Sequence, residues 1–254
     1  MTDQDSGRRP KYQRIADELR TAIQSGDFAP GDRLPGENDL MSTYDVARMT
    51  ARQALSVLRN EGLAEARKGA GVFVRRFRPL RRRGIPRLAH THWGAGRSVW
   101  SADIADRSLL VDQIEVRAAA PAGARVARVL DLASADAAVC MRSRRFVLDE
   151  KPVLFSVSYL PAALAEGTAI AQPDTGPGGT YARLAELGHR PVHFREEIRS
   201  RMPTAEEAER LALEFGTPVI LICRTAFTEE GVPVELNEMT LDSASYVLEY
   251  DFDA

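Results

Sequence analysis

Two arginines one helical turn apart, Arg48 and Arg52, have the type and spacing that recognition of DNA requires. Positions i and i+4 of a helix share one face, so both guanidinium groups would project together from the N-terminal half of the helix expected there. A guanidinium can donate two hydrogen bonds to the O6 and N7 atoms of guanine in the major groove. Thr50, between them, would reach a phosphate. The alternative is a solvated helix face that contacts no nucleic acid.

A second pair of arginines, Arg142 and Arg144, lies two residues apart on a strand predicted over residues 139–148. Alternate side chains of a strand share one face of the sheet, so both guanidinium groups would point the same way. Two cations held together need either carboxylates or an anionic ligand. The glycine-rich run at 176–180 leads into a helix, whose free N–H groups at the N-terminus favour a phosphate or carboxylate. These features predict an anion site, unless Asp or Glu residues of neighbouring strands neutralise the arginines.

Sequence motifs of catalysis and of cofactor or metal binding are missing: there is no G-x-S-x-G, no H-E-x-x-H and no Walker A lysine. The glycines at 69–71 precede a predicted strand, whereas a dinucleotide-binding glycine motif opens a helix. His90 and His92 would share a strand face, but no carboxylate or cysteine has the spacing to complete a metal site. Cys140 and Cys223 lie in apolar runs that are typical of buried free thiols. We therefore expect no catalytic residue, no metal and no cofactor.

The elements that precede Arg48 are two predicted helices. Apolar residues recur at helical spacing from Tyr12 until Gly26 ends the pattern. A turn rich in proline and glycine at 29–36 follows, and residues 37–44 form a short second helix.

The third helix carries Arg48 and Arg52 on one side, and Gly62 ends it. Its opposite side is an apolar stripe made of Ala51, Ala54, Leu55 and Leu58. Short apolar runs at 63–66 and 72–74 then flank a basic tip that contains glycine, which is typical of a hairpin. Three helices followed by this wing predict a winged helix-turn-helix.

Four motifs of this region resemble the N-terminal domain of the GntR family of bacterial transcription regulators. They are Gly31-Asp-Arg-Leu-Pro-Gly-Glu37, Arg48-Met-Thr-Ala-Arg-Gln-Ala-Leu55, Glu61-Gly-Leu63 and Gly69-Ala-Gly-Val-Phe-Val74. The resemblance implies that the DNA-contacting positions are Asn38, Arg48, Met49, Thr50, Arg52, Lys68 and Gly69. Two positions depart from the family pattern, since Asn38 stands where arginine is usual and Met49 where a small polar residue is common. Both departures concern sequence preference.

The run RRFRPLRRR at residues 75–83 connects this domain to the rest of the chain. Pro79 disfavours a continuous helix and the like charges repel one another, so residues 76–84 are predicted to be a solvated linker. The alternative is an arginine-rich segment that follows DNA phosphates or enters a minor groove.

From residue 85 onward, strands alternate with helices. Strands are predicted over 111–117, 139–148, 153–159, 194–202, 219–228, 234–241 and 246–252. Helices are predicted over 181–187 and from a capping box at Thr204 and Glu207 to a stop at Gly216. Consecutive antiparallel strands with helices between them predict an α+β fold. The expected domains are therefore residues 10–75, the linker 76–84 and residues 85–254.

Residues 85–254 resemble the UTRA effector-sensing domain of the HutC subfamily, which shares its fold with chorismate lyase. The resemblance rests on Arg142-Ser-Arg144, Ser158-Tyr-Leu-Pro161, Gly178-Gly-Thr-Tyr181 and Gly231-Val-Pro-Val-Glu235. It implies effector contacts at Arg142, Arg144, Gly179, Thr180, Tyr181 and Glu235. Leu241 stands where some sensors of sugar phosphates have tyrosine. Two alternatives remain open: an enzyme of the chorismate-lyase type that carries a DNA-binding module, and a DNA-binding repressor that senses no ligand.

The charge of the chain is divided in a way that agrees with two functions. Residues 1–84 hold 17 Lys and Arg against 11 Asp and Glu, whereas the remainder holds 17 against 25, so +6 precedes −8. A basic module on an acidic body indicates that only the first part binds a polyanion. No apolar run is long enough for a membrane span or a secretion signal, so we expect a cytoplasmic protein. The sequence thus predicts a homodimeric repressor that binds a pseudo-palindromic double-stranded DNA operator and is released by an anionic effector, a phosphorylated sugar or a carboxylate.

Overall fold

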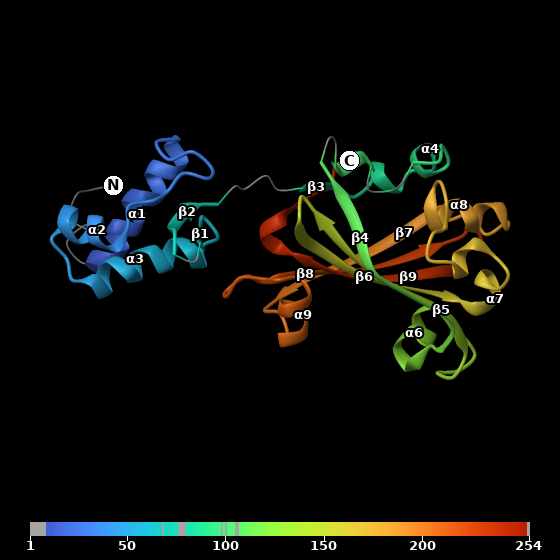
Figure 1. The fold of residues 1–254 in the computed structure, drawn as a ribbon. Helices are drawn as coiled ribbons and strands as arrows, with labels where there is room; N and C mark the ends of the chain where they lie inside the picture. Colours follow the sequence, from blue (N-terminus) through green and yellow to red (C-terminus); the bar gives the residue numbers. More distant parts are fainter. Residues whose placement is uncertain are drawn as a thin grey trace. The chain divides into compact units, whose positions relative to one another are not determined.

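The computed structural model describes residues 9–67, 69–75, 80–97, 99, 101–104 and 107–252 of the 254-residue chain. The chain divides into two compact units (Figure 1), one over residues 1–78 with 215–217 and the other over 79–214 and 218–254. They are called here the N-terminal unit and the C-terminal unit, and each is described by itself.

The N-terminal unit is a winged helix-turn-helix, as predicted. Its elements are α1 (Lys11–Ser25), α2 (Glu37–Tyr44), α3 (Arg48–Asn60), β1 (Ala64–Arg67) and β2 (Gly71–Val74). Helix α1 ends where Gly26 adopts a φ of 89°, a left-handed conformation that glycine accepts without a steric penalty. Strands β1 and β2 pair antiparallel and form the wing.

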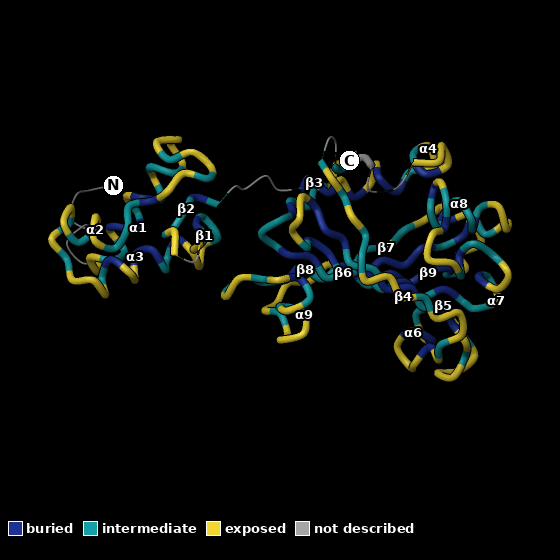
Figure 2. Tube along the Cα trace, in the orientation of Figure 1, coloured by how far each residue is buried: buried dark blue, intermediate teal, exposed yellow. Residues whose placement is uncertain are grey.

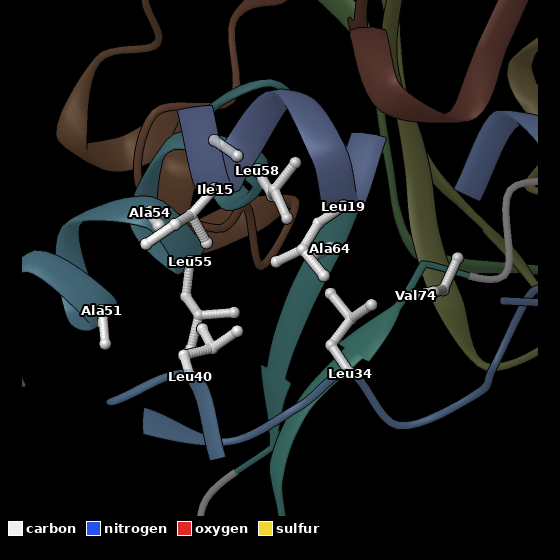
Figure 3. Packing of buried hydrophobic residues seen from close by; sticks show 11 residues of the cluster. Ile15, Leu19, Leu34, Leu40, Ala51, Ala54, Leu55, Leu58, Ala64 and Val74 are labelled. Atoms are coloured by element: carbon white, nitrogen blue, oxygen red, sulfur yellow. The ribbon is translucent and has the colours of Figure 1, made fainter. Parts of the chain in front are cut away.

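A single apolar cluster holds the three helices and the wing of this unit together. Figure 3 shows Ile15 and Leu19 of α1 packed with side chains of α3 and β1. The stripe predicted on α3 is buried as a whole: Ala51, Ala54, Leu55 and Leu58. Because this side of α3 faces the core, its opposite side is free to meet a ligand.

The C-terminal unit is built on one six-stranded antiparallel sheet, which confirms the predicted α+β class. Its strands are β4 (Leu109–Pro121), β5 (Ala138–Leu148), β6 (Lys151–Pro161), β7 (His193–Arg201), β8 (Val219–Phe227) and β9 (Pro233–Asp242). They lie in the order β4-β5-β6-β9-β8-β7. The hairpin between β5 and β6 turns at Asp149 and Glu150, both at positive φ. The central strand β9 is mostly buried, whereas the edge strand β7 is mostly exposed (Figure 2).

Helices cover both faces of this sheet (Figure 1). Helix α6 (Gly123–Val129) packs on one face against Val139 and Leu236. The capping box predicted at Thr204 and Glu207 is present and starts α9 (Ala205–Arg210), which is shorter than predicted. The other face, which carries Arg142 and Arg144, is covered by α4 (His90–Trp93), α7 (Ala162–Ala165) and α8 (Gly179–Glu186).

The second half of the predicted linker is a strand of the C-terminal unit, so that part of the linker prediction is wrong. Residues Leu80–Arg83 form β3, which pairs parallel with β10 (Tyr246–Glu249) in a separate two-stranded sheet. Leu80 and Arg82 point inward and are buried, whereas Arg81 and Arg83 are exposed. Residues 76–79 lie outside the described residues.

Short helical segments complete the unit: η1 (Pro86–Leu88), α5 (Ser101–Ile104), η2 (Ala169–Ala171) and η3 (Ser243–Ser245). His90 and His92 lie in α4 and not on a strand as predicted. Within the described ranges, no three His, Cys, Asp or Glu side chains are grouped as a metal site would need. None of the described helices is long and apolar enough to cross a membrane.

Candidate DNA-binding surface and ligand cavity

Arg48 and Arg52 project from the exposed side of α3, and residues of α2 hold both guanidinium groups. The Nε and Nη2 atoms of Arg52 donate to the two carboxylate oxygens of Glu37 at 2.7 and 3.2 Å. Nη2 of Arg48 donates to Oδ1 of Asn38 at 3.1 Å. The hydrogen bond and the charge of Arg52 lower the pKa of Glu37, so this carboxylate is ionised at neutral pH. The two helices therefore present two oriented guanidinium groups and one amide on a single surface.

The remaining predicted DNA contacts differ in how the structure places them. Met49 is 68% exposed, which is unusual for an apolar side chain in a folded domain. Thr50 is half-buried, and its N–H group bonds to the carbonyl of Ala47 at the start of α3. Gly69 lies at the exposed wing tip with a φ of 74°, and Lys68 lies outside the described residues. Asn38, Arg48, Met49 and Arg52 are thus grouped on α2 and α3.

A cavity of about 320 Å³ lies inside the C-terminal unit, against the sheet face that α8 covers. Five of the six predicted effector residues line it: Arg144, Gly179, Thr180, Tyr181 and Glu235. Their convergence comes from β5, β9 and the start of α8. Gly178 precedes this helix with a φ of 77°, and a Cβ atom there would come within 2.6 Å of the carbonyl oxygen of Trp93. Only glycine therefore fits this approach of the chain.

Arg144 is a cation of the cavity lining whose donors the structure leaves available. It forms no hydrogen bond or ion pair with any residue in the described part of the chain, although its side chain is largely enclosed. Burial lowers the pKa of Arg144, while the charges of Glu235 and Asp174 oppose that shift. A guanidinium stays protonated under such a shift, so the cavity holds a positive charge with unfilled donors.

Arg142, the sixth predicted residue, does not line the cavity. Its guanidinium donates to the carbonyl oxygens of Ile170, Gln172 and Pro173, the last at 3.1 Å. The side chain is 1% exposed. Arg142 thus holds the segment that leads into the lining residues 175–180, and its charge is met by backbone dipoles.

Tyr181 and Glu235 form a buried pair at the wall of the cavity. The hydroxyl of Tyr181 donates to Oε2 of Glu235 at 2.7 Å. Burial raises the pKa of Tyr181 well above its ordinary value, so the hydroxyl remains a donor. The second carboxylate oxygen of Glu235 is available to accept from a ligand hydroxyl or N–H group.

Three further arginines that sequence reasoning missed also line the cavity: Arg82, Arg87 and Arg224. Arg82 forms a buried ion pair with Glu196. Arg87 pairs with Asp103 at 2.9 Å, and both of these side chains are buried. No local pattern signals these residues, because each partner lies far away along the sequence.

Arg224 differs from the other two arginines that the sequence did not indicate. Its Nη1 atom lies 3.8 Å from Glu196, too far for a hydrogen bond, and its Nε and Nη1 atoms have no hydrogen-bond acceptor. Arg224 therefore adds unfilled donors to those of Arg144.

Two family models match the two units. Residues 11–74 match the bacterial regulatory proteins of the gntR family, and residues 112–246 match the UTRA domain. These families, and the relatives below, are DNA-binding regulators rather than enzymes.

Relatives of known sequence and of known structure match this chain over most of its length. An uncharacterized HTH-type transcriptional regulator of Streptomyces coelicolor is 34% identical over 96% of this chain and 93% of its own. The HTH-type transcriptional repressor NagR of Bacillus subtilis is 27% identical over 89% of this chain and 88% of its own. A crystal structure described as that of a GntR-family transcriptional regulator has a TM-score of 0.64 at 26% identity and covers 97% of this chain and 98% of that one. The chain therefore belongs to the GntR family of transcriptional regulators and carries a UTRA domain at its C-terminal side.

Proposed function

We propose that this regulator is a repressor of the HutC subfamily that binds a pseudo-palindromic operator as a homodimer and is released by an anionic small molecule. The exposed pair Arg48 and Arg52 would read the bases, and a two-fold operator follows from two copies of one recognition helix. The repressor assignment is supported by the similarity to NagR, which is named a repressor.

The available guanidinium of Arg144 is the observation that carries the effector part of this proposal. Two other cations of the cavity wall are met by carboxylates, Arg82 by Glu196 and Arg87 by Asp103, whereas Arg224 shares with Arg144 the property of unfilled donors. A repressor that senses no ligand would gain stability from neutralising Arg144 in the same way, because an enclosed charge without a partner is unfavourable. An anion bound between Arg144 and the start of α8, whose first N–H groups have no side-chain cap, would meet this charge.

Strand β3 would couple binding of the anion to the DNA-binding unit. In the sequence, β3 begins at Leu80, directly after the boundary between the two units at residue 78. Arg82 of β3 lines the cavity, so a ligand bound there would contact the strand that follows the N-terminal unit along the chain. Effector binding would shift the position of β3 and thereby the spacing of two DNA-binding units. Thermodynamic reciprocity then requires that operator DNA weaken effector binding by the same factor.

The experiment that tests this proposal starts with selection of bound fragments from random DNA by the full chain. Release of the selected fragment is then measured by fluorescence anisotropy while a fractionated metabolite extract is added. We expect an anionic fraction to release the DNA from the wild-type protein. Arg144→Ala should remain bound in that fraction, and Arg117→Ala should be released normally. Arg117 is the matched control because its side chain is 62% exposed on β4.

Two outcomes would contradict the proposal. If Arg144→Ala is released as readily as the wild type, the effector does not use this cavity. A monomer in sedimentation both with and without the operator would refute the homodimer.

A further inference from the structure

The floor of the cavity changes from polar to apolar along the direction of its strands. One row of paired residues across β5, β6, β9 and β8 is polar throughout. Its residues Ser158, Asn237 and Arg224 line the cavity, whereas Arg142 of the same row does not. Two residues further along the same strands, the next row is mixed: Arg144, Ser156, Met239 and Ile222. The row after that, which also includes β4, is entirely apolar: Val111, Phe146, Leu154 and Leu241.

The apolar row belongs to the apolar core of the unit and also lines the cavity. All four of its residues line the cavity, and Val99, Leu109 and Met239 extend the apolar lining. Alternate residues of a strand are about 6.6 Å apart, so the apolar row lies roughly 13 Å from the polar row. A molecule that spans the two rows therefore meets donors at one end and hydrocarbon at the other.

The charged groups that cover the apolar end of the cavity are already paired, so this end remains apolar for a ligand. Arg82 and Arg87 are already paired with Glu196 and Asp103, so neither supplies an unmet charge. Tyr246 contributes its ring to the apolar cluster, and its buried hydroxyl has no hydrogen-bond partner in the described part of the chain. That hydroxyl can bond to one terminal polar atom of a ligand. It cannot satisfy the several hydroxyls of a sugar ring.

We propose that the effector of this cavity is an organic anion with a hydrocarbon body, whose carboxylate or phosphate lies at Arg144 and whose body lies over Phe146, Leu154 and Leu241. This inference rests on the proposed function and narrows its ligand class. A hexose phosphate would place hydroxyls against the apolar row, where each hydroxyl without a partner weakens binding by about tenfold. A hydrocarbon body gains affinity there from every methylene removed from water.

The volume sets the size of the body. At roughly 30 Å³ for each water molecule in the liquid, a cavity of about 320 Å³ holds around ten waters. Octanoate, with ten non-hydrogen atoms, is a probe of matching size.

The test is a series of straight-chain carboxylates, butanoate, hexanoate and octanoate, titrated into the full-length protein by isothermal calorimetry. Each buried methylene should tighten binding about fourfold, so octanoate should bind roughly 250-fold more tightly than butanoate. The heat capacity change of octanoate binding should be negative, as burial of apolar surface requires. Octan-1-ol, which has the same chain without the charge, should bind much more weakly than octanoate.

A matched pair of variants on β4 locates the hydrocarbon. Leu109 lines the cavity, whereas the next residue, Leu110, is 58% exposed and belongs to the opposite face of the strand. Leu109→Gln should weaken octanoate binding at least tenfold and leave butanoate binding nearly unchanged. Leu110→Gln should bind both carboxylates as the wild type does. Arg144→Ala should weaken both carboxylates alike.

The outcomes separate this inference from the proposed function. If affinity does not rise with chain length, or if both leucine variants bind octanoate equally well, the hydrocarbon assignment is wrong. Binding of glucose 6-phosphate then tests whether the cavity is an anion-sensing site at all. If glucose 6-phosphate binds in a manner that requires Arg144, the cavity is still an anion-sensing site and only the nature of the body has been misassigned. Failure of every anion to bind would overturn both.

Discussion

Replacing Arg142 with alanine should destabilise the C-terminal unit, because this side chain holds a loop from within. Its guanidinium donates to three backbone carbonyls, those of Ile170, Gln172 and Pro173, and is itself buried. Alanine would remove the donors and leave three carbonyl oxygens to find water or remain unpaired. The segment released in this way leads directly into residues 175–180, which line the cavity.

The size of the effect follows from the number of bonds. A buried acceptor that loses its partner costs about 1 kcal/mol or more, so three acceptors cost about 3 kcal/mol. For a folded unit of 150–250 residues, each kcal/mol lowers the melting temperature by roughly 2–4 °C. Arg142→Ala should therefore lower the melting temperature of the C-terminal unit by about 6–12 °C. Arg142→Lys, which retains a buried cation with three donors, should lose less.

Tryptophan fluorescence measures this unit selectively. The sequence has two tryptophans, Trp93 and Trp100, and both belong to the C-terminal unit. Trp93 is fully buried against α8, so its emission reports loss of the fold. Suppose instead that Arg142→Ala melts like the wild type and selectively loses its response to octanoate. In that case Arg142 would contact the ligand directly, and the structural role argued here would be wrong.

Three further predictions concern DNA binding and pH. Arg52→Ala should weaken specific DNA binding roughly 5- to 150-fold and relax selectivity at one operator position. The control Arg59→Ala, in the last turn of α3, should not change selectivity. If a binding assay shows equal losses on all DNA sequences, Arg52 contacts a phosphate and not a base. The logarithm of the affinity should fall linearly with the logarithm of salt concentration, with a slope near −0.9 for each phosphate neutralised, and a salt-independent affinity would contradict the electrostatic assignment. Burial alone would raise the pKa of Glu196, but the hydrogen bond and charge of Arg82 outweigh it and lower the pKa. The resulting stability is present above about pH 4.3 and lost as pH falls through the lowered value, so Glu196→Gln should reduce the acid dependence of the tryptophan melt.

Local patterns predicted the N-terminal unit well because each of its elements is defined by adjacent residues. The stripe on α3 repeats at helical spacing, and Gly26 ends α1 through its own backbone conformation. Likewise, the capping box at Thr204 and Glu207 starts α9 through residues three positions apart. Such signals survive tertiary packing because packing acts on the same faces that the pattern defines.

The different environments of Arg142 and Arg144 show what a local sequence pattern does not determine. Strand alternation correctly placed both on one face of β5. However, the carbonyl groups that bind Arg142 come from a loop near residue 172, about thirty positions later. A strand pattern specifies the face of a side chain and contains no information about which segment covers it. The distinction between a cation that holds a loop and a cation that lines a cavity therefore appears only in three dimensions.

The arginine run that ends at Arg83 is a second case in which the partners of the side chains lie far away in the sequence. Considered alone, its charges repel one another and favour a solvated segment or one that follows phosphates. In the fold, Glu249 of β10 neutralises Arg81 and Arg83, and Glu196 of β7 neutralises Arg82. These carboxylates lie more than a hundred residues away in sequence, so no window around the run contains them. Arg82 is buried in its ion pair and cannot contact DNA, whereas Arg81 and Arg83 are exposed and form ion pairs at the surface. Arg82 instead places the start of the C-terminal unit at the wall of the cavity, where the anion of the proposed function would contact it.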